Sequence, residues 1–335
     1  MLRIFRSNQI FVAIVLFVYL VVIRSGAILG WIEAPEGANT GGLLYQSWFG
    51  WMKDAPVFSA ITALILVFLQ SFIVNFLADD FRLLGDRNWF PGLFYGICAS
   101  AFPDYLFVSA PLVAATFIPI GLYKIFQAFQ KPNVHAAILD SGIWLSVGCL
   151  FYPPLIWLVP AGFAGLLIVR VFRSNEMFIY VAGALIPIFW GWLWYFWADK
   201  GASFRDLQLG SLRLVNGFNV AWTDGDLARL SMLVVFILLF LLGLPAVLNK
   251  KGIQIQKYVS VLFWFLVAGI FSIFFQEQWH WANWFVTIAP LAVFLSLGYQ
   301  ETFKKWWIEM AHLILLLFIF AIQYLKIWLP YVQYL

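Results

Sequence analysis

The feature that most constrains this chain is a succession of long apolar runs separated by short polar segments. A helix needs about 20 apolar residues to cross a bilayer core roughly 30 Å thick. Such a chain folds as a bundle of spanning helices, because a helix satisfies its own backbone hydrogen bonds in lipid. The sequence contains about eleven candidate spans: 9–29, 56–77, 89–103, 107–127, 136–151, 153–170, 177–198, 229–248, 257–275, 284–299 and 307–328.

Two of these runs, 89–103 and 136–151, are short and are expected to tilt little or to end inside the protein. Composition agrees with a membrane chain, since 64% of the 335 residues are hydrophobic and 11% are charged. A soluble globular protein is about 25% charged. We therefore predict an all-α polytopic membrane protein, folded as a single integral membrane domain over residues 1–335.

The first apolar run is interpreted as a retained helix. It follows a short basic start and lacks the small-residue cleavage site of a signal peptide. The cysteines, Cys98 and Cys149, both lie in apolar runs, so we interpret them as buried packing residues. The spacing of possible ligands predicts no metal site, and no cofactor is predicted.

The distribution of Lys and Arg predicts the orientation, because basic residues concentrate in cytoplasmic loops. With a cytoplasmic N-terminus, 13 of the 20 Lys and Arg residues lie on the cytoplasmic side. The net charge of +4 thus reflects topology and predicts no nucleic-acid partner. We expect a multi-pass membrane protein with outer loops at 30–55, 199–228 and 276–283. The middle loop has leucines close together and is expected to contain an interfacial amphipathic helix.

Outer-face carboxylates are the first candidate site residues. Glu33 and Glu36 lie in the first outer loop, and Asp104 follows Pro103 in a turn too short to leave the membrane surface. A carboxylate in such a place can act as a general base toward a hydroxyl, or orient a phosphate through a metal. The alternative is that each is an ordinary solvated or locally paired loop charge.

Outer-face cations are the second set of candidates. Arg205, Arg213, Arg229 and His280 could bind a lipid phosphate, since guanidinium groups hold phosphate in a bidentate way. His280 lies between two tryptophans, and an ordinary interfacial histidine is the alternative. The sequence contains no Walker motif, HExxH or GxSxG.

Two stretches of the chain carry a resemblance to an uncharacterised family of polytopic inner-membrane proteins from Bacteroidota. The first includes Asn88-Trp89-Phe90-Pro91-Gly92 and Phe102-Pro103-Asp104, and the second includes Asp140-Ser141-Gly142-Ile143-Trp144 and Arg170-Val171-Phe172-Arg173.

The order of segments is also similar to that of the GT-C class of glycosyltransferases, which use polyprenyl-phosphate sugars. Those enzymes begin with one span, followed by an outer loop with an acidic catalytic residue and a bundle of short helices. The resemblance implies catalytic roles for Glu33, Glu36 and Asp104, and phosphate binding by Arg205, Arg213 and His280. This chain departs from the class in lacking an Asp-Glu pair in the first loop and a large soluble C-terminal domain.

The expected function is therefore transfer of a sugar from a polyprenyl-phosphate donor to a periplasmic acceptor. The expected partners are the bilayer, a lipid-linked sugar and other envelope membrane proteins. One alternative is a non-catalytic subunit of an envelope complex for secretion, motility or glycan assembly. A transporter or flippase is the other.

Overall fold

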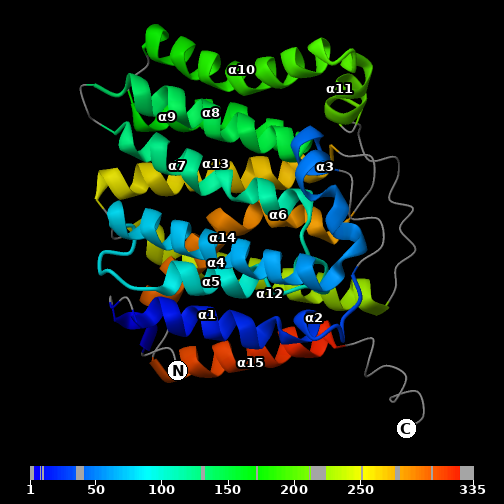
Figure 1. Cartoon of the computed structure of the whole chain (residues 1–335). Coiled ribbons are helices and arrows are strands. Elements are labelled where there is room, and N and C mark those ends of the chain that lie inside the picture. Colours follow the sequence, from blue (N-terminus) through cyan, green and yellow to red (C-terminus); the bar gives the residue numbers. More distant parts are fainter. Residues whose placement is uncertain are drawn as a thin grey trace.

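The computed structural model describes residues 4–7, 9, 11–34, 41–129, 133–170, 173–210, 212, 224–249, 252–275, 280–302 and 305–324. Helices account for all of the regular structure in these ranges, and they lie side by side in one stack (Figure 1). The elements are η1 (Ile4–Arg6), α1 (Phe11–Ile23), α2 (Ser25–Ile28), α3 (Leu43–Phe49), η2 (Gly50–Asp54), α4 (Pro56–Asp80), α5 (Phe90–Cys98), η3 (Pro103–Tyr105), α6 (Ala110–Ala115), α7 (Phe117–Gln127), α8 (His135–Phe151), η4 (Pro153–Trp157), α9 (Leu158–Val169), α10 (Ser174–Trp197), α11 (Gly201–Gln208), α12 (Asp224–Asn249), α13 (Ile253–Ile273), η5 (Trp281–Thr287), α14 (Ile288–Thr302) and α15 (Lys305–Gln323).

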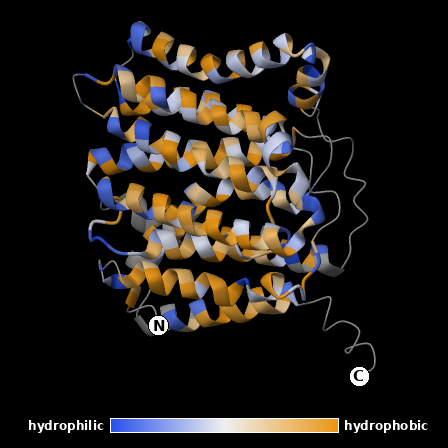
Figure 2. Ribbon diagram, viewed as in Figure 1, coloured by the Kyte–Doolittle hydropathy of each residue, from blue (hydrophilic) through white to orange (hydrophobic). Residues whose placement is uncertain are grey.

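Each predicted span corresponds to one of these helices or to two consecutive ones, so the all-α prediction is confirmed. Within the described residues, five helical stretches are long and apolar enough to cross a membrane: Pro56–Asp80, Ala110–Gln127, Ser174–Trp197, Ile253–Ile273 and Trp281–Tyr299. Hydrophobic residues dominate the middle of the helices, and hydrophilic ones gather at their two ends (Figure 2). This pattern is compatible with a multi-pass membrane protein. The number of spans and their orientation stay predictions.

The two ends of the bundle are named here by residues that they hold. The Asp104 end contains the turn at 99–109, and the Arg170 end lies opposite, where α9 ends and α10 begins (Figure 1). Helix α5 is short because protein surrounds it on every side: all of its residues are buried. Helix α10, in contrast, forms one edge of the stack and packs mainly against α8. A helix, α11, lies in the 199–228 loop, but of the leucines that suggested one only Leu207 falls within it. Its place at a membrane interface stays a prediction.

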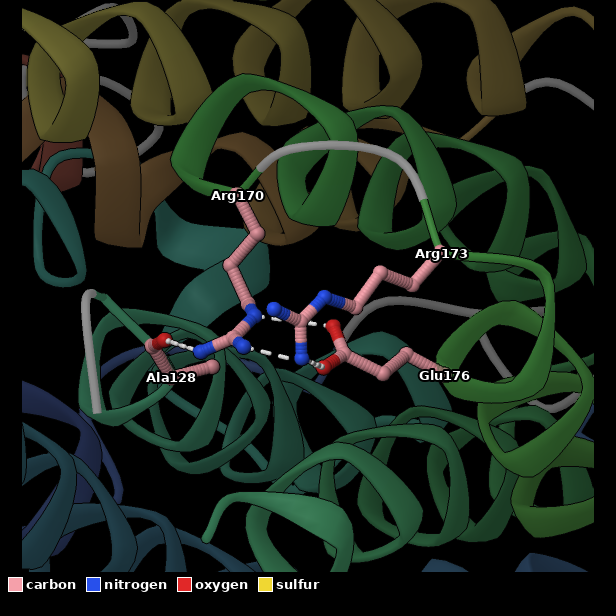
Figure 3. Close-up of polar contacts among 4 residues, drawn as sticks. All are labelled: Ala128, Arg170, Arg173 and Glu176. Atoms are coloured by element: carbon pink, nitrogen blue, oxygen red, sulfur yellow. Dashed lines mark hydrogen bonds and ion pairs between the residues drawn. The ribbon is translucent and has the colours of Figure 1, made fainter. Parts of the chain in front are cut away.

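A buried ion pair fastens the Arg170 end. The Arg170 guanidinium donates two hydrogen bonds to the Glu176 carboxylate, at 2.8 and 2.9 Å, and a third to the Ala128 carbonyl at 2.7 Å. The Arg173 guanidinium approaches the same carboxylate only to 3.8 Å, from a more exposed position (Figure 3). Arg170 therefore joins the end of α7 to the start of α10.

The predicted orientation can be tested with single cysteines at the two ends of α4. Lys53 and Arg87 are both exposed, and they lie at the Asp104 end and the Arg170 end respectively. In intact spheroplasts, a membrane-impermeant maleimide should label Lys53→Cys, whereas Arg87→Cys should be labelled only after permeabilisation. The native cysteines are free and buried, so background labelling should be low. The reverse pattern would overturn the orientation.

Candidate functional site

The site is built on the turn that follows α5. This helix ends at Cys98, and Pro103 starts the single 3₁₀ turn that carries Asp104, because proline suits the first turn of a helix. Arg24 holds the turn from inside the bundle, and its side chain is fully buried. Its guanidinium donates to the carbonyls of Ala99, at 3.0 Å, and Tyr105, at 2.7 Å. A cation at this place also suits the negative end of the α5 dipole.

Other side chains hold the same turn from neighbouring elements. The Gln323 amide of α15 donates to the Ser100 carbonyl at 2.6 Å. Farther along, the backbone N–H of Val108 donates to Ser59 at 2.9 Å, and the Tyr45 hydroxyl donates to the Val108 carbonyl at 3.2 Å. Polar contacts from four separate parts of the chain therefore set the position of Asp104.

Asp104 belongs to a cluster of charged and aromatic side chains that we call the ion cluster: Asp104, Asp226, Arg229, His280 and Trp281. Arg229 bridges two carboxylates, with Nε 2.9 Å from Asp104 Oδ2 and Nη1 3.0 Å from Asp226 Oδ1. The Trp281 indole N–H donates to Asp226 Oδ1 at 2.7 Å. Asp226 and Arg229 are spaced i, i+3 in the first turns of α12, where an acid also suits the helix dipole. The cluster thus ties α12 to η3 and η5.

Burial governs the electrostatics of the ion cluster. The exposed fractions of the Asp104, Asp226 and Arg229 side chains are 13%, 12% and 18%. Desolvation raises the pKa of Asp104, and this effect is opposed by Arg229 and, less strongly, by His280. Burial lowers the pKa of His280, while Asp104 acts in the other direction. A carboxylate with a raised pKa is a better proton acceptor than an ordinary surface aspartate.

An apolar cavity of about 340 Å³ lies directly beneath the ion cluster. Its wall includes Phe102 and Tyr105, which flank Asp104, and Leu233, one helical turn beyond Arg229. The ring of Phe102 packs edge-on against that of Trp281, with centroids 5.7 Å apart. The rest of the wall comes from Cys98 at the end of α5 and from α12, α13, η5 and α14. Charged and apolar surfaces therefore meet at one place in the Asp104 end.

The predicted site residues are brought together only in part. Asp104 and His280 lie within electrostatic range of each other. Glu33 is exposed, but its neighbour Ile32 packs on a small cluster that includes Leu106 and Phe107. The segment with Glu33 therefore begins beside the Asp104 turn.

The remaining predicted residues do not join the ion cluster. Arg205 is exposed on α11, and its guanidinium lies 3.8 Å from the equally exposed Asp206. Glu36 and Arg213 lie outside the described residues.

Two residues of the site were missed or undervalued by the sequence reasoning. Asp226 was treated as part of a polar loop, although its i, i+3 spacing to Arg229 at the start of an apolar run indicates a paired helix start. Arg24 lies near the end of the first predicted span and was not among the candidate site residues. The sequence offers no local signal for its contacts with Ala99 and Tyr105, which follow 75 and 81 residues later.

No group of three His, Cys, Asp or Glu side chains that could hold a metal ion occurs among the described residues. Two carboxylates, a guanidinium, an imidazole and an indole above an apolar cavity can accept a proton and contact hydroxyl groups and hydrocarbon. Comparison with known proteins found no matching family model, no curated relative and no similar solved structure.

Proposed function

We propose that this protein is a membrane transferase that moves a sugar from a polyprenyl-phosphate donor to an acceptor hydroxyl at the Asp104 end. The observation that carries the proposal is the buried Asp104 carboxylate, oriented by Arg229 at the edge of the apolar bundle. Buried carboxylates with raised pKa values are typical of sites that move protons. The GT-C resemblance supports the same reaction class, since it implies an acidic residue at this place.

In the proposed reaction Asp104 is the general base. It accepts the proton of the acceptor hydroxyl as that oxygen bonds to the anomeric carbon of the sugar. The bond from the anomeric carbon to the phosphate oxygen breaks at the same time, and polyprenyl phosphate leaves with the electron pair. Arg229 orients the base, and His280 and Trp281 bound the space for the sugar. Glu33 lies on the adjoining segment as a second acid.

The proposal is tested by Asp104→Asn, assayed as transfer of radiolabelled sugar from a polyprenyl-phosphate donor in membranes. Loss of a general base typically lowers the rate by about 10²–10⁴, and we expect a loss of this size. Asp206→Asn is the matched control, because Asp206 is exposed at the same end and its removal should leave the rate unchanged. Glu33→Gln should give a smaller loss. Melting temperatures of the purified variants separate loss of chemistry from loss of folding.

One result would overturn the enzyme proposal. If Asp104→Asn and Glu33→Gln, alone and together, retain full transfer and complement a deletion, the ion cluster has no catalytic role. In Asp104→Asn the Arg229 guanidinium keeps Asp226 as its partner. This variant should therefore fold and lose only the transfer activity.

A second candidate function is a subunit of an envelope complex, favoured by the outward face of α10. Phe178, Trp190 and Trp194 are highly exposed there, at the edge of the stack (Figure 1). A partner helix could cover this face. Under this alternative, charged substitutions at Trp190 or Trp194 abolish function while the carboxylate variants are silent. The cavity offers no support for a transporter, since its lining on α12 ends at Phe240, short of the Arg170 end, and its lining on α13 and α14 lies in the Asp104 half of those helices.

A further inference from the structure

The lining of the cavity beneath the ion cluster is suited to hydrocarbon. Four lining side chains carry a polar atom, those of Cys98, Tyr105, Trp284 and Thr287, and the others are aliphatic or phenylalanine. The surface that faces the cavity is almost entirely apolar. The Thr287 hydroxyl already donates to the Trp284 carbonyl at 2.7 Å, so it is satisfied within the protein. A polar ligand would lose its hydrogen bonds to water here without replacement, whereas an apolar chain loses none. The volume falls within the range of about 300–1,000 Å³ that ligand sites occupy.

The cavity is open at the side of the bundle and closed toward its centre. Two of its lining residues are substantially exposed on the outside of the bundle, Ile237 of α12 at 44% and Ile270 of α13 at 37%. Cys98, Phe102 and Tyr105, in contrast, form a buried floor. Helix α12 packs closely on α14 and much less on α13, although α13 follows it in the chain. The mouth therefore lies between α12 and α13, beside Ile237 and Ile270 on the apolar side of the bundle.

We propose that the cavity binds the hydrocarbon chain of a membrane lipid. The chain enters from the side, between α12 and α13, and the polar head of the lipid lies in the ion cluster. An ordinary lipid contact covers a convex helix face, but this chain reaches inward to the floor beneath Asp104. Because Phe102 and Tyr105 flank Asp104 and Leu233 follows Arg229 by one turn, chain and head meet at the charged residues. That the head carries a sugar rests on the proposed function. That a hydrocarbon chain binds is inferred from the apolar lining of the cavity alone.

The test uses the full-length protein in nanodiscs and a polyprenyl phosphate with a diazirine in its chain. After illumination, mass spectrometry should place the label on the peptides that contain Cys98–Tyr105 and the cavity face of α12. Unlabelled polyprenyl phosphate should compete. Label spread evenly over the outer faces of α4 and α10, without competition, would overturn the inference.

Neighbouring residues of α12 provide a matched pair of variants. Ile237 lines the mouth, whereas Leu238 is similarly exposed and faces away from the cavity. Ile237→Trp should fill the mouth and weaken binding of the probe about tenfold or more. Leu238→Trp should bind as the wild type does, and both variants should fold, since both side chains already lie at the surface. Equal labelling of the two variants would contradict a mouth between α12 and α13.

Binding is measured without turnover, so this inference and the proposed function can fail separately. If the probe labels the cavity but Asp104→Asn transfers sugar normally, the lipid site stands and the transferase falls. Phosphatidylglycerol with the same diazirine chain distinguishes the source of the hydrocarbon. Equal, competable cavity labelling by both lipids supports the chain site and counts against a polyprenyl donor.

Discussion

Replacement of Arg170 by methionine should lower the free energy of unfolding by about 3–5 kcal/mol, the range for breaking one side of a buried ion pair. The exposed fractions of the Arg170 and Glu176 side chains are 9% and 3%. Without Arg170, the Glu176 carboxylate stays buried and keeps only the contact with Arg173 at 3.8 Å. The Ala128 carbonyl also loses its hydrogen bond from Arg170. Thermal unfolding in detergent, followed by tryptophan fluorescence, measures the loss.

Arg173→Met is the matched control for Arg170→Met. Its side chain is 68% exposed and it approaches the same carboxylate only to 3.8 Å. Exposed pairs contribute about 0–1 kcal/mol, so this variant should unfold close to the wild type. If the two variants lose equal stability, the closer and more buried contact that Arg170 makes with Glu176 in Figure 3 does not contribute more than the contact of Arg173.

Replacement of Arg229 by glutamine should have a comparable effect at the other end of the bundle, about 3–5 kcal/mol near neutral pH. Arg229 is the guanidinium that bridges Asp104 and Asp226, and the change leaves two neighbouring buried carboxylates without it. The loss is measured by thermal unfolding of the purified variant.

The loss in Arg229→Gln should shrink as the pH falls. Burial already raises the pKa of Asp104 in the folded protein, and removal of Arg229 takes away the largest opposing effect. An acid with a raised pKa in the folded state binds more protons folded than unfolded, so acidification stabilises the folded state. The gain begins as pH falls through the raised pKa and is complete below the unfolded value, about 3.8. A loss independent of pH would contradict this account.

Arg205→Gln is the control for the Arg229 variant. Arg205 lies at the same end, but its side chain and that of Asp206 are both exposed. Its removal should change stability little at any pH. The triple variant Asp104→Asn/Asp226→Asn/Arg229→Gln should recover part of the loss, because it leaves no buried charge in the cluster.

The longer helices could be predicted from the sequence because they coincide with long apolar runs. The range 56–77 became α4 (Pro56–Asp80), and 136–151 became α8 (His135–Phe151). The short run at 89–103 became α5, and its brevity follows from burial on all sides, where no lipid thickness has to be matched. The two cysteines are free and buried, as their apolar surroundings predicted.

The candidate site could be predicted only where its chemistry is local. Asp104 was identified because its turn is too short to leave the membrane surface. Its partner Arg229 lies 125 positions farther along the chain, and no periodicity in the sequence specifies that separation. Glu33 drew attention as a loop carboxylate, yet loop composition does not specify which side chains the fold encloses. The cavity likewise arises from the gap between α12 and α13, which is a property of packing.

The buried Arg24 has a consequence for the order of biogenesis. Its backbone acceptors, Ala99 and Tyr105, are 75 and 81 residues farther along the chain, and Gln323, which holds the same turn, comes almost at the end. At translation rates of about 5–20 residues per second, the acceptors follow Arg24 by roughly 4–16 s. A guanidinium without partners is costly in hydrocarbon and can reach the headgroup layer from a helix end. We therefore expect the first predicted span to reach its final depth only after the ribosome has delivered the third.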